Sequence, residues 1–252
     1  MEITGNTILI TGGGSGIGRG LAEAFHKAGN QVVIAGRRLS ALEETVKANP
    51  GMAAMQLDIA DPAAVTKFAA ELVEKFPKLN VVINNAGIMK PENLLEPLNA
   101  GAVEQTIGIN LLGPIRLTAA LLPHLRKQAK ATVMTVSSGL AFVPLMITPT
   151  YCATKAAIHS WSQSLRYQLK DTSVEVIEIV PPYVQTELMG SQQQEDERAM
   201  PLKEFIEETM SILKAQPDAK EVCVERVKFL SEAAERGDYG KVFKTLNGMW
   251  SH

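Results

Sequence analysis

Short apolar runs alternate with stretches of helical spacing along most of this chain. Residues 7–10 form a short apolar run typical of a buried strand, and apolar residues then recur at positions 17, 21, 24, 25 and 28, the spacing of one helix face. The same reading predicts strands over 7–10, 31–35, 55–59, 81–84, 132–136 and 174–180, and helices over 17–28, 40–49, 62–76, 102–127 and 150–170.

Strands that alternate with helices indicate parallel strands joined by right-handed crossovers. The pattern therefore predicts an α/β fold with a Rossmann-type doubly wound parallel sheet, in a single domain over residues 1–252. The regularity fades after Pro181. Residues 191–198 are polar and suggest a mobile loop over a site. Residues 221–227 alternate as a last strand would, whereas 239–246 look more helical, and the position of the last strand is left open.

Local signals predict several element boundaries. Gly29 stands where a left-handed cap would end the first helix. Ser40 with Glu43 has the spacing of a capping box, which would open the second helix at Ser40. Asp61 followed by Pro62 predicts the start of the third.

Composition narrows the classes of function. The formal net charge is −2 and the basic residues form no stripe, which disfavours a nucleic-acid partner. No uninterrupted apolar run is long enough to cross a bilayer, and no secretory signal pattern precedes the first strand, so we expect a cytoplasmic protein without a membrane partner. The two cysteines, Cys152 and Cys223, fit no metal-ligand spacing, and we expect reduced thiols and no metal.

Glycines follow the first predicted strand. Gly12, Gly16 and Gly18 would allow backbone to approach a pyrophosphate closely, at a helix N-terminus whose unpaired amides favour an anion. A tight turn with nothing bound is the plain alternative, but the flanking strand and helix favour a nucleotide.

Four motifs occur in a characteristic order: Thr11-Gly-x-x-x-Gly-x-Gly, Asn84-Asn85-Ala86-Gly87, Ser138 after the fifth strand, and Tyr151-x-x-x-Lys155. Together they resemble the short-chain dehydrogenase/reductase family over about three quarters of the chain. Residues 79–88 also resemble a bacterial oxidoreductase subgroup linked with D-alanylation of lipoteichoic acid, a likeness that does not identify a substrate.

Tyr151 and Lys155 are four residues apart on one predicted helix and so share a face. A nearby ammonium lowers the pKa of a phenol, and a catalytic acid works best with a pKa near the operating pH. By resemblance, Tyr151 would protonate a carbonyl oxygen, Ser138 would hydrogen-bond that oxygen, and Lys155 would also hold the nicotinamide ribose. Asn110, a polar residue in an apolar run, would sit in a kinked turn and anchor a water linked to Lys155.

The cofactor is predicted from the end of the second strand. An NAD-selective site would place a carboxylate there, whereas this chain has Arg37 and Arg38, which would bind a 2′-phosphate. We therefore expect NADP(H), with NAD(H) as the alternative and Arg37 as the main contact. The full set of expected cofactor-binding residues is Gly12, Gly14, Ser15, Gly16, Ile17, Gly18, Arg37, Arg38, Asp58, Ile59, Asn85, Ala86, Gly87, Tyr151, Lys155, Pro181, Val184 and Thr186.

The chain departs from the family pattern after the sixth strand, where Pro181-Pro182 replaces the usual Pro-Gly and would stiffen the loop. An apolar loop over 139–148 and a substrate loop over about 183–210 suggest a carbonyl or alcohol substrate with an apolar body. Its expected neighbours are Met89, Tyr183, Met189 and Met200.

The function predicted from these residues is reversible hydride transfer between a nicotinamide and a carbonyl or secondary alcohol. The alternatives are a non-catalytic dinucleotide-binding regulator or scaffold, and a lyase or epimerase on the same fold. We expect a homodimer or homotetramer, as in the family. His159 is predicted to serve packing or an interface, and Cys152 inert packing.

Overall fold

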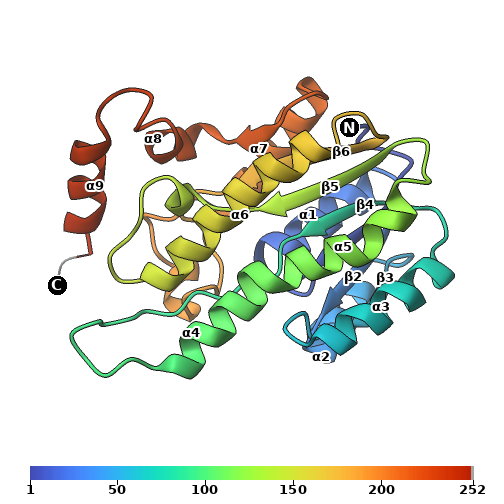
Figure 1. Cartoon of the computed structure of the whole chain (residues 1–252), viewed down its shortest axis with the longest axis horizontal. Coiled ribbons are helices and arrows are strands. Elements are labelled where there is room, and N and C mark those ends of the chain that lie inside the picture. Colours follow the sequence, from blue (N-terminus) through green and yellow to red (C-terminus); the bar gives the residue numbers. More distant parts are fainter. Residues whose placement is uncertain (251–252) are drawn as a thin grey trace.

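The computed structural model describes residues 1–250, which fold around a seven-stranded parallel sheet in the order β3-β2-β1-β4-β5-β6-β7 (Figure 1). This confirms the predicted single-domain, doubly wound fold. The strands are β1 Thr7–Thr11, β2 Gln31–Gly36, β3 Ala53–Gln56, β4 Leu79–Asn84, β5 Ala131–Val136, β6 Val174–Val180 and β7 Glu221–Cys223.

Helices cover both faces of the sheet. Those of the first face pack with residues such as Phe25 and Phe205, and those of the second with Phe68 and Leu117. Helices α8 and α9 lie beyond the carboxyl ends of the strands, at the left of Figure 1. The helices are α1 Gly16–Lys27, α2 Leu39–Ala48, α3 Pro62–Lys75, α4 Ala100–Ile107, α5 Gly113–Leu125, α6 Pro149–Gln168, α7 Leu202–Ala215, α8 Lys228–Ser231 and α9 Tyr239–Gly248.

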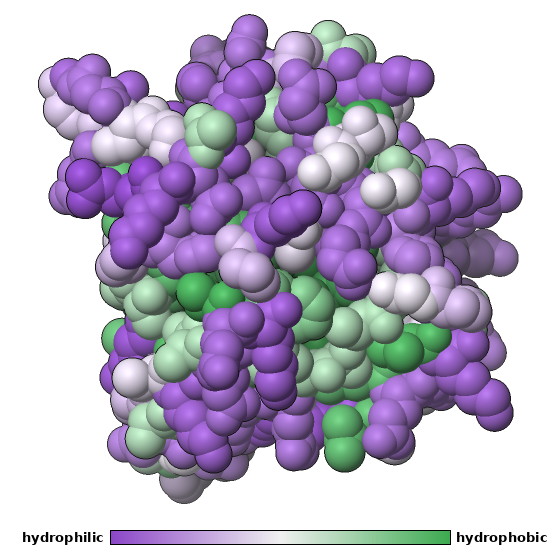
Figure 2. All heavy atoms as spheres, turned by 90° about the vertical axis from the view of Figure 1, so that its right-hand side faces the viewer, coloured by the Kyte–Doolittle hydropathy of each residue, from purple (hydrophilic) through white to green (hydrophobic). Residues whose placement is uncertain are grey.

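The strand order reverses between β1 and β4, and ligands of doubly wound sheets bind outside the carboxyl ends of the strands at such a point. The opposite end of the molecule carries hydrophilic residues around a central band of hydrophobic ones (Figure 2). The candidate site is therefore expected at the carboxyl ends of β1 and β4.

The predicted helix over 102–127 is one continuous segment with a π-helical turn, Gly108–Leu112, between α4 and α5. By length and composition alone, residues Ala100–Leu125 could span a bilayer, since an 18-residue window within them has a mean hydropathy of 1.3. Leu117, Leu121 and Leu125 are, however, buried against the sheet, which accounts for much of this apolar character.

Several boundaries differ from the predictions. The prediction of a capping box at Ser40 is wrong. Helix α2 begins at Leu39, because the Arg38 carbonyl already accepts the first helical hydrogen bond, from the amide of Leu42, and Arg38 is the N-cap residue. The predicted strand over 55–59 lies instead at Ala53–Gln56, because pairing with β2 ends where Gly36 meets Gln56.

The structure shows where the last strand lies, which the sequence left open. Residues 221–223 form the last strand, and 239–248 are helical. The segment predicted as a loop over 191–198 contains a short 3-10 turn with Gln193 buried, and α7 begins at Leu202, inside the range predicted for the substrate loop. Gly29, with φ of 89°, and Asp61, which accepts from the amide of Ala63, end and begin helices as predicted.

Candidate active site

A cavity of about 770 Å³ lies at the carboxyl ends of the strands. Every predicted cofactor-binding residue except Asp58 lines it. Asp58 lies beyond the end of β3, where its carboxylate accepts a hydrogen bond from the amide of Ala60, so it forms a turn. Its neighbour Ile59 lines the cavity, and a contact of Asp58 with the cofactor stays a prediction.

The glycine turn between β1 and α1 needs its glycines for two separate reasons. Gly16 adopts a φ of 51°, in the left-handed region that favours glycine. A Cβ on Gly18 would collide with the carbonyl oxygen of Gly12 and with the side chain of Asn85. The turn is thus held against the end of β4, at the cavity wall.

Thr11 connects the end of β1 to the segment after β4 through hydrogen bonds, a role that its place in the glycine motif does not predict. Its hydroxyl accepts hydrogen bonds from the amides of Asn85 and Ala86, each over 3.1 Å, and its carbonyl accepts one from the Asn85 side chain over 2.9 Å. These bonds fix the Asn85–Ala86 segment beside the glycine turn.

The end of β2 brings two guanidinium groups to the cavity wall. Arg37 and Arg38 both line it, and Arg38 donates to the Ser15 hydroxyl over 3.1 Å. Among described residues, the cavity lining includes no aspartate and Glu187 is its only glutamate. This corner can therefore bind an anion without a neighbouring aspartate opposing it.

Tyr151, Ser138 and Lys155 are all buried and all line the cavity. Ser138 follows β5 and also caps the next turn by accepting from the amide of Leu140. The Lys155 ammonium donates to the carbonyl of Val136 over 2.8 Å and lies 5.5 Å from the centroid of the Tyr151 ring. The structure thus brings these three side chains together at the cavity wall.

The sequence predicts that Lys155 lowers the pKa of Tyr151, whereas burial is the largest effect on that pKa in the structure. Burial raises that pKa, and the hydrogen bond with Ser138 lowers it only in part. Burial also lowers the pKa of Lys155, to about 8, against an opposing effect of the Glu178 charge. The ammonium is held by a backbone carbonyl beside the ring, and burial dominates the protonation of both groups.

Asn110 lies in the π-helical turn, which agrees with the kinked turn that the sequence predicts. Its side-chain amide, however, bonds to protein groups. Its Oδ1 accepts from the amide of Ile88 over 2.9 Å, and its Nδ2 donates to the Ile88 carbonyl over 2.8 Å and to Thr154. Asn110 lies outside the main cavity, in a small hollow that it shares with Asn84 and Lys155. There the buried Oδ1 of Asn84 has no partner among described residues.

The far end of the cavity is mainly apolar. Met89, Tyr183 and Met189 line it, as predicted, together with Leu140 and Leu145 of the loop over 139–148. Met200 does not: it is buried and pairs with Val184 as a short bridge.

The C-terminal segment supplies walls that the sequence did not predict, namely Leu246, Met249 and Trp250. The Trp250 ring meets Tyr183 edge-on at 5.6 Å, and the Arg198 guanidinium lies over it at 4.6 Å. The apolar positions of residues 239–250 were the available signal, but they do not show where that helix docks.

Two residues near Tyr151 lie outside the cavity lining. The Cys152 thiol is buried and bonds to Leu145, and burial raises its pKa, which agrees with a packing role. His159 forms an ion pair with Glu178, with 2.9 Å between its Nδ1 and a carboxylate oxygen.

Residues 6–197 match the family model described as short chain dehydrogenase. The chain is 40% identical over 253 residues to an uncharacterized oxidoreductase DltE of Bacillus subtilis, covering 98% of each chain. It is 30% identical over 192 residues to an NADP-dependent 3-hydroxy acid dehydrogenase of Schizosaccharomyces pombe, covering 74% of each.

Solved structures share the fold. A short-chain dehydrogenase from Streptomyces avermitilis superposes with a TM-score of 0.81 at 23% identity, covering 97% of this chain and all of that one. A 3-ketoacyl-(acyl-carrier-protein) reductase from Brucella melitensis, complexed with NADH, gives 0.78 at 26% identity, covering 87% of this chain and 96% of that one.

Proposed function

Because this chain belongs to the short-chain dehydrogenase family, we propose that it is an NADP(H)-dependent oxidoreductase that reduces a ketone or aldehyde to the alcohol. The observation that carries this is a single cavity whose walls combine the glycine turn, two arginines and the buried Tyr151, Ser138 and Lys155.

Arg37 and Arg38 support NADP(H) over NAD(H), since a 2′-phosphate would meet two guanidiniums and no aspartate. One relative is named as NADP-dependent and one structural neighbour is complexed with NADH, so these similar proteins do not decide between the two cofactors. The proposed preference for NADP(H) therefore rests on Arg37 and Arg38. The glycine turn would hold the pyrophosphate, and Ile59 would contact the adenine. Asn85, Ala86, Gly87, Pro181, Val184 and Thr186 would surround the nicotinamide half.

The cofactor supplies the hydride, and the protein supplies the proton and its placement. Tyr151 would be the proton donor to the carbonyl oxygen, because its phenol lies in the cavity wall with the Lys155 ammonium 5.5 Å from the ring centroid. The Ser138 hydroxyl would donate a second hydrogen bond to that oxygen. Lys155, which lines the same cavity and lies beside the Tyr151 ring, would return a proton to Tyr151.

The substrate would carry an apolar body beside its carbonyl. Leu145, Met189 and Trp250 surround the far end of the cavity, where burial of apolar surface favours binding. A single short polar substrate would leave these walls uncovered.

NADPH oxidation against a panel of aromatic, aliphatic and short polar ketones tests this function. Wild type should oxidise NADPH with the apolar ketones, and Tyr151→Phe should still bind NADPH, seen by fluorescence, without turnover. Tyr167→Phe, on the same helix and 71% exposed, is the control and should match wild type. Unchanged turnover in Tyr151→Phe rejects the proton-donor role, and NADPH binding without turnover on any ketone favours the non-catalytic alternative.

A homodimer or homotetramer is part of the proposal. Leu94, Leu95 and Leu98 are exposed in the segment before α4, and apolar surface of this kind is typical of contacts between subunits. Light scattering of the purified chain gives the state directly.

A further inference from the structure

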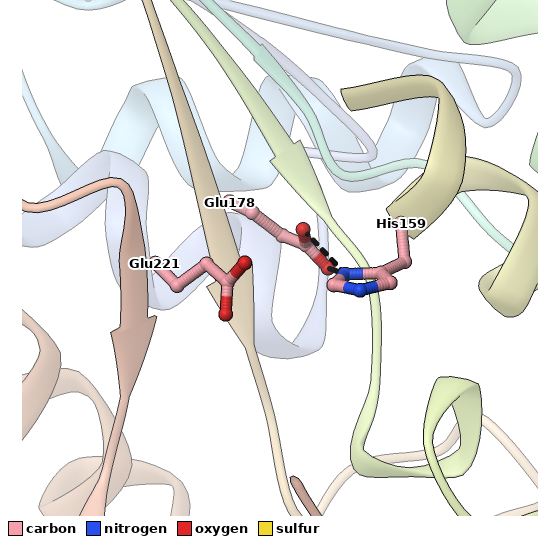
Figure 3. A group of neighbouring side chains, drawn as sticks. All are labelled: His159, Glu178 and Glu221. Carbon is pink, nitrogen blue, oxygen red and sulfur yellow. Dashed lines mark hydrogen bonds and ion pairs between the residues drawn. The ribbon is translucent and has the colours of Figure 1, made fainter. Parts of the chain in front are cut away.

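Three potential ligand side chains meet outside the cavity, beneath α6. Glu178 on β6 and Glu221 on β7 are register partners in a parallel pair, so their side chains leave the same face of the sheet. His159 points at Glu178 from α6, which covers that face (Figure 3). One ligand atom from each of the three lies within 4.8 Å of the others.

The protein balances the charges of this cluster only in part, through His159 and through Lys155, whose pKa the Glu178 charge raises. Glu178 is 0% exposed and Glu221 is half-buried, and like charges directly opposite on adjacent strands destabilise a sheet. His159, whose pKa its hydrogen bond with Glu178 raises, compensates one carboxylate at most. Within residues 1–250 no lysine or arginine pairs with either, and Arg166 donates to the carbonyls of Val176 and Lys220 instead.

We propose that His159, Glu178 and Glu221 bind a divalent cation, with Zn²⁺ as the best match. One imidazole and two carboxylates are ligands that Zn²⁺ accepts, and three protein ligands leave a position for water. Two carboxylates and a neutral imidazole also neutralise a charge of +2. The sequence predicts no metal because the three residues are far apart along the chain and share no ligand spacing.

The second ring nitrogen of His159 fits this role. Zn²⁺ bound at Nδ1 requires the proton on Nε2, which then needs an acceptor. The side-chain amide of Gln163, one helical turn further on, lies 3.1 Å from Nε2. Its nitrogen faces the ring here, and a half-turn of the amide presents its oxygen instead.

The ring is also oriented and reachable. Phe142 packs against it with centroids 4.6 Å apart, which limits its rotation. The His159 side chain is 20% exposed and Glu221 lies on β7, the edge strand, so a cation can enter from solvent. Bound there, it would tie α6 to the last two strands, one helical turn beyond Lys155.

Calorimetric titration of Zn²⁺ alone into EDTA-treated full-length protein tests the site. Wild type should bind one Zn²⁺ per chain, and Glu221→Gln should weaken binding by about tenfold or more, the scale of losing support around a metal. Glu175→Gln is the matched control, on the same strand with a side chain 49% exposed, and should bind like wild type. His159→Asn should also lose the visible absorption of Co²⁺ used as a probe.

Thermal unfolding separates ligand loss from misfolding. In EDTA, Glu221→Gln should unfold at or above the wild-type temperature because one of two like charges is gone, and only wild type and Glu175→Gln should gain stability with Zn²⁺. Equal Zn²⁺ affinity in wild type and Glu221→Gln, or no binding of one ion per chain by wild type, would overturn the proposal. Neither outcome depends on the proposed hydride transfer.

Discussion

Lys155 donates its hydrogen bond to the carbonyl of Val136, at the end of β5, rather than to another side chain. A buried ammonium with one backbone partner is costly to ionise, which is why its pKa falls to about 8. This relationship links the candidate active site to the pH dependence of stability.

The first prediction concerns Lys155→Met. Between pH 8 and the ordinary 10.5 of lysine, the unfolded chain holds a proton that folded wild type has released, so the free energy of unfolding rises with pH across this window. Below pH 8 the folded protein carries the buried Lys155 charge and its full destabilising effect, and above pH 10.5 this effect is absent because the lysine is neutral in both states. Relative to Lys155→Met, wild type should gain on the order of 3 kcal/mol from pH 7 to 10.5, measured by urea unfolding. A pH-independent difference between the two proteins contradicts this.

Cofactor choice is tested by Arg37→Ala. Losing charge-assisted hydrogen bonds to a 2′-phosphate should raise KM for NADPH roughly 10- to 100-fold and leave KM for NADH unchanged. Arg38→Ala should cost less, because Arg38 already bonds to Ser15. Steady-state kinetics with both cofactors decide, and equal losses with NADPH and NADH remove Arg37 from phosphate recognition.

Asn110→Ala should impair stability and turnover together. It leaves the amide and carbonyl of Ile88 without their partners, each at a cost of about 1–3 kcal/mol. Thr154→Val removes one hydrogen bond of Asn110 and the bond that Thr154 donates to the Tyr151 carbonyl, leaves both bonds of Ile88 in place, and should destabilise less. Denaturant unfolding and kcat measure the two effects, and a stable Asn110→Ala protein would show that water replaces the lost bonds.

Gly113 and Gly101 form a matched pair in the long helical segment. A Cβ on Gly113 would lie 2.7 Å from the Ile59 side chain and 2.8 Å from its carbonyl oxygen, so Gly113→Ala should destabilise by about 1–3 kcal/mol. On Gly101 a Cβ would meet nothing closer than 3.7 Å, and Gly101→Ala should stabilise by up to about 1 kcal/mol. Equal unfolding midpoints would mean that α5 can move away from Ile59.

Local patterns predicted much of the fold and of the site. Gly16, Tyr151 and Lys155 act through turn geometry and helical spacing, which neighbouring residues determine. The length of β3 is instead decided by its pairing with β2, so Asp58 could not be placed from its own surroundings.

Other features depend on contacts between distant segments. The π-helical turn at Asn110 inserts a residue that helical periodicity does not reveal. Burial raises the pKa of Tyr151, and this burial depends on contacts that form only on folding. The prediction from the sequence took account only of the charge of Lys155. Trp250 reaches Tyr183 and Arg198 across the cavity for the same reason.

The position of Trp250 has a practical bearing on experiments with this protein. Leu246, Met249 and Trp250 form part of the cavity wall, yet they follow β7, the last strand in the described residues. Trimming or tagging this tail would therefore alter the cavity wall directly, although the tail lies outside the sheet. Variants of the tail therefore offer a route to altered substrate range without redesign of the nucleotide-binding half.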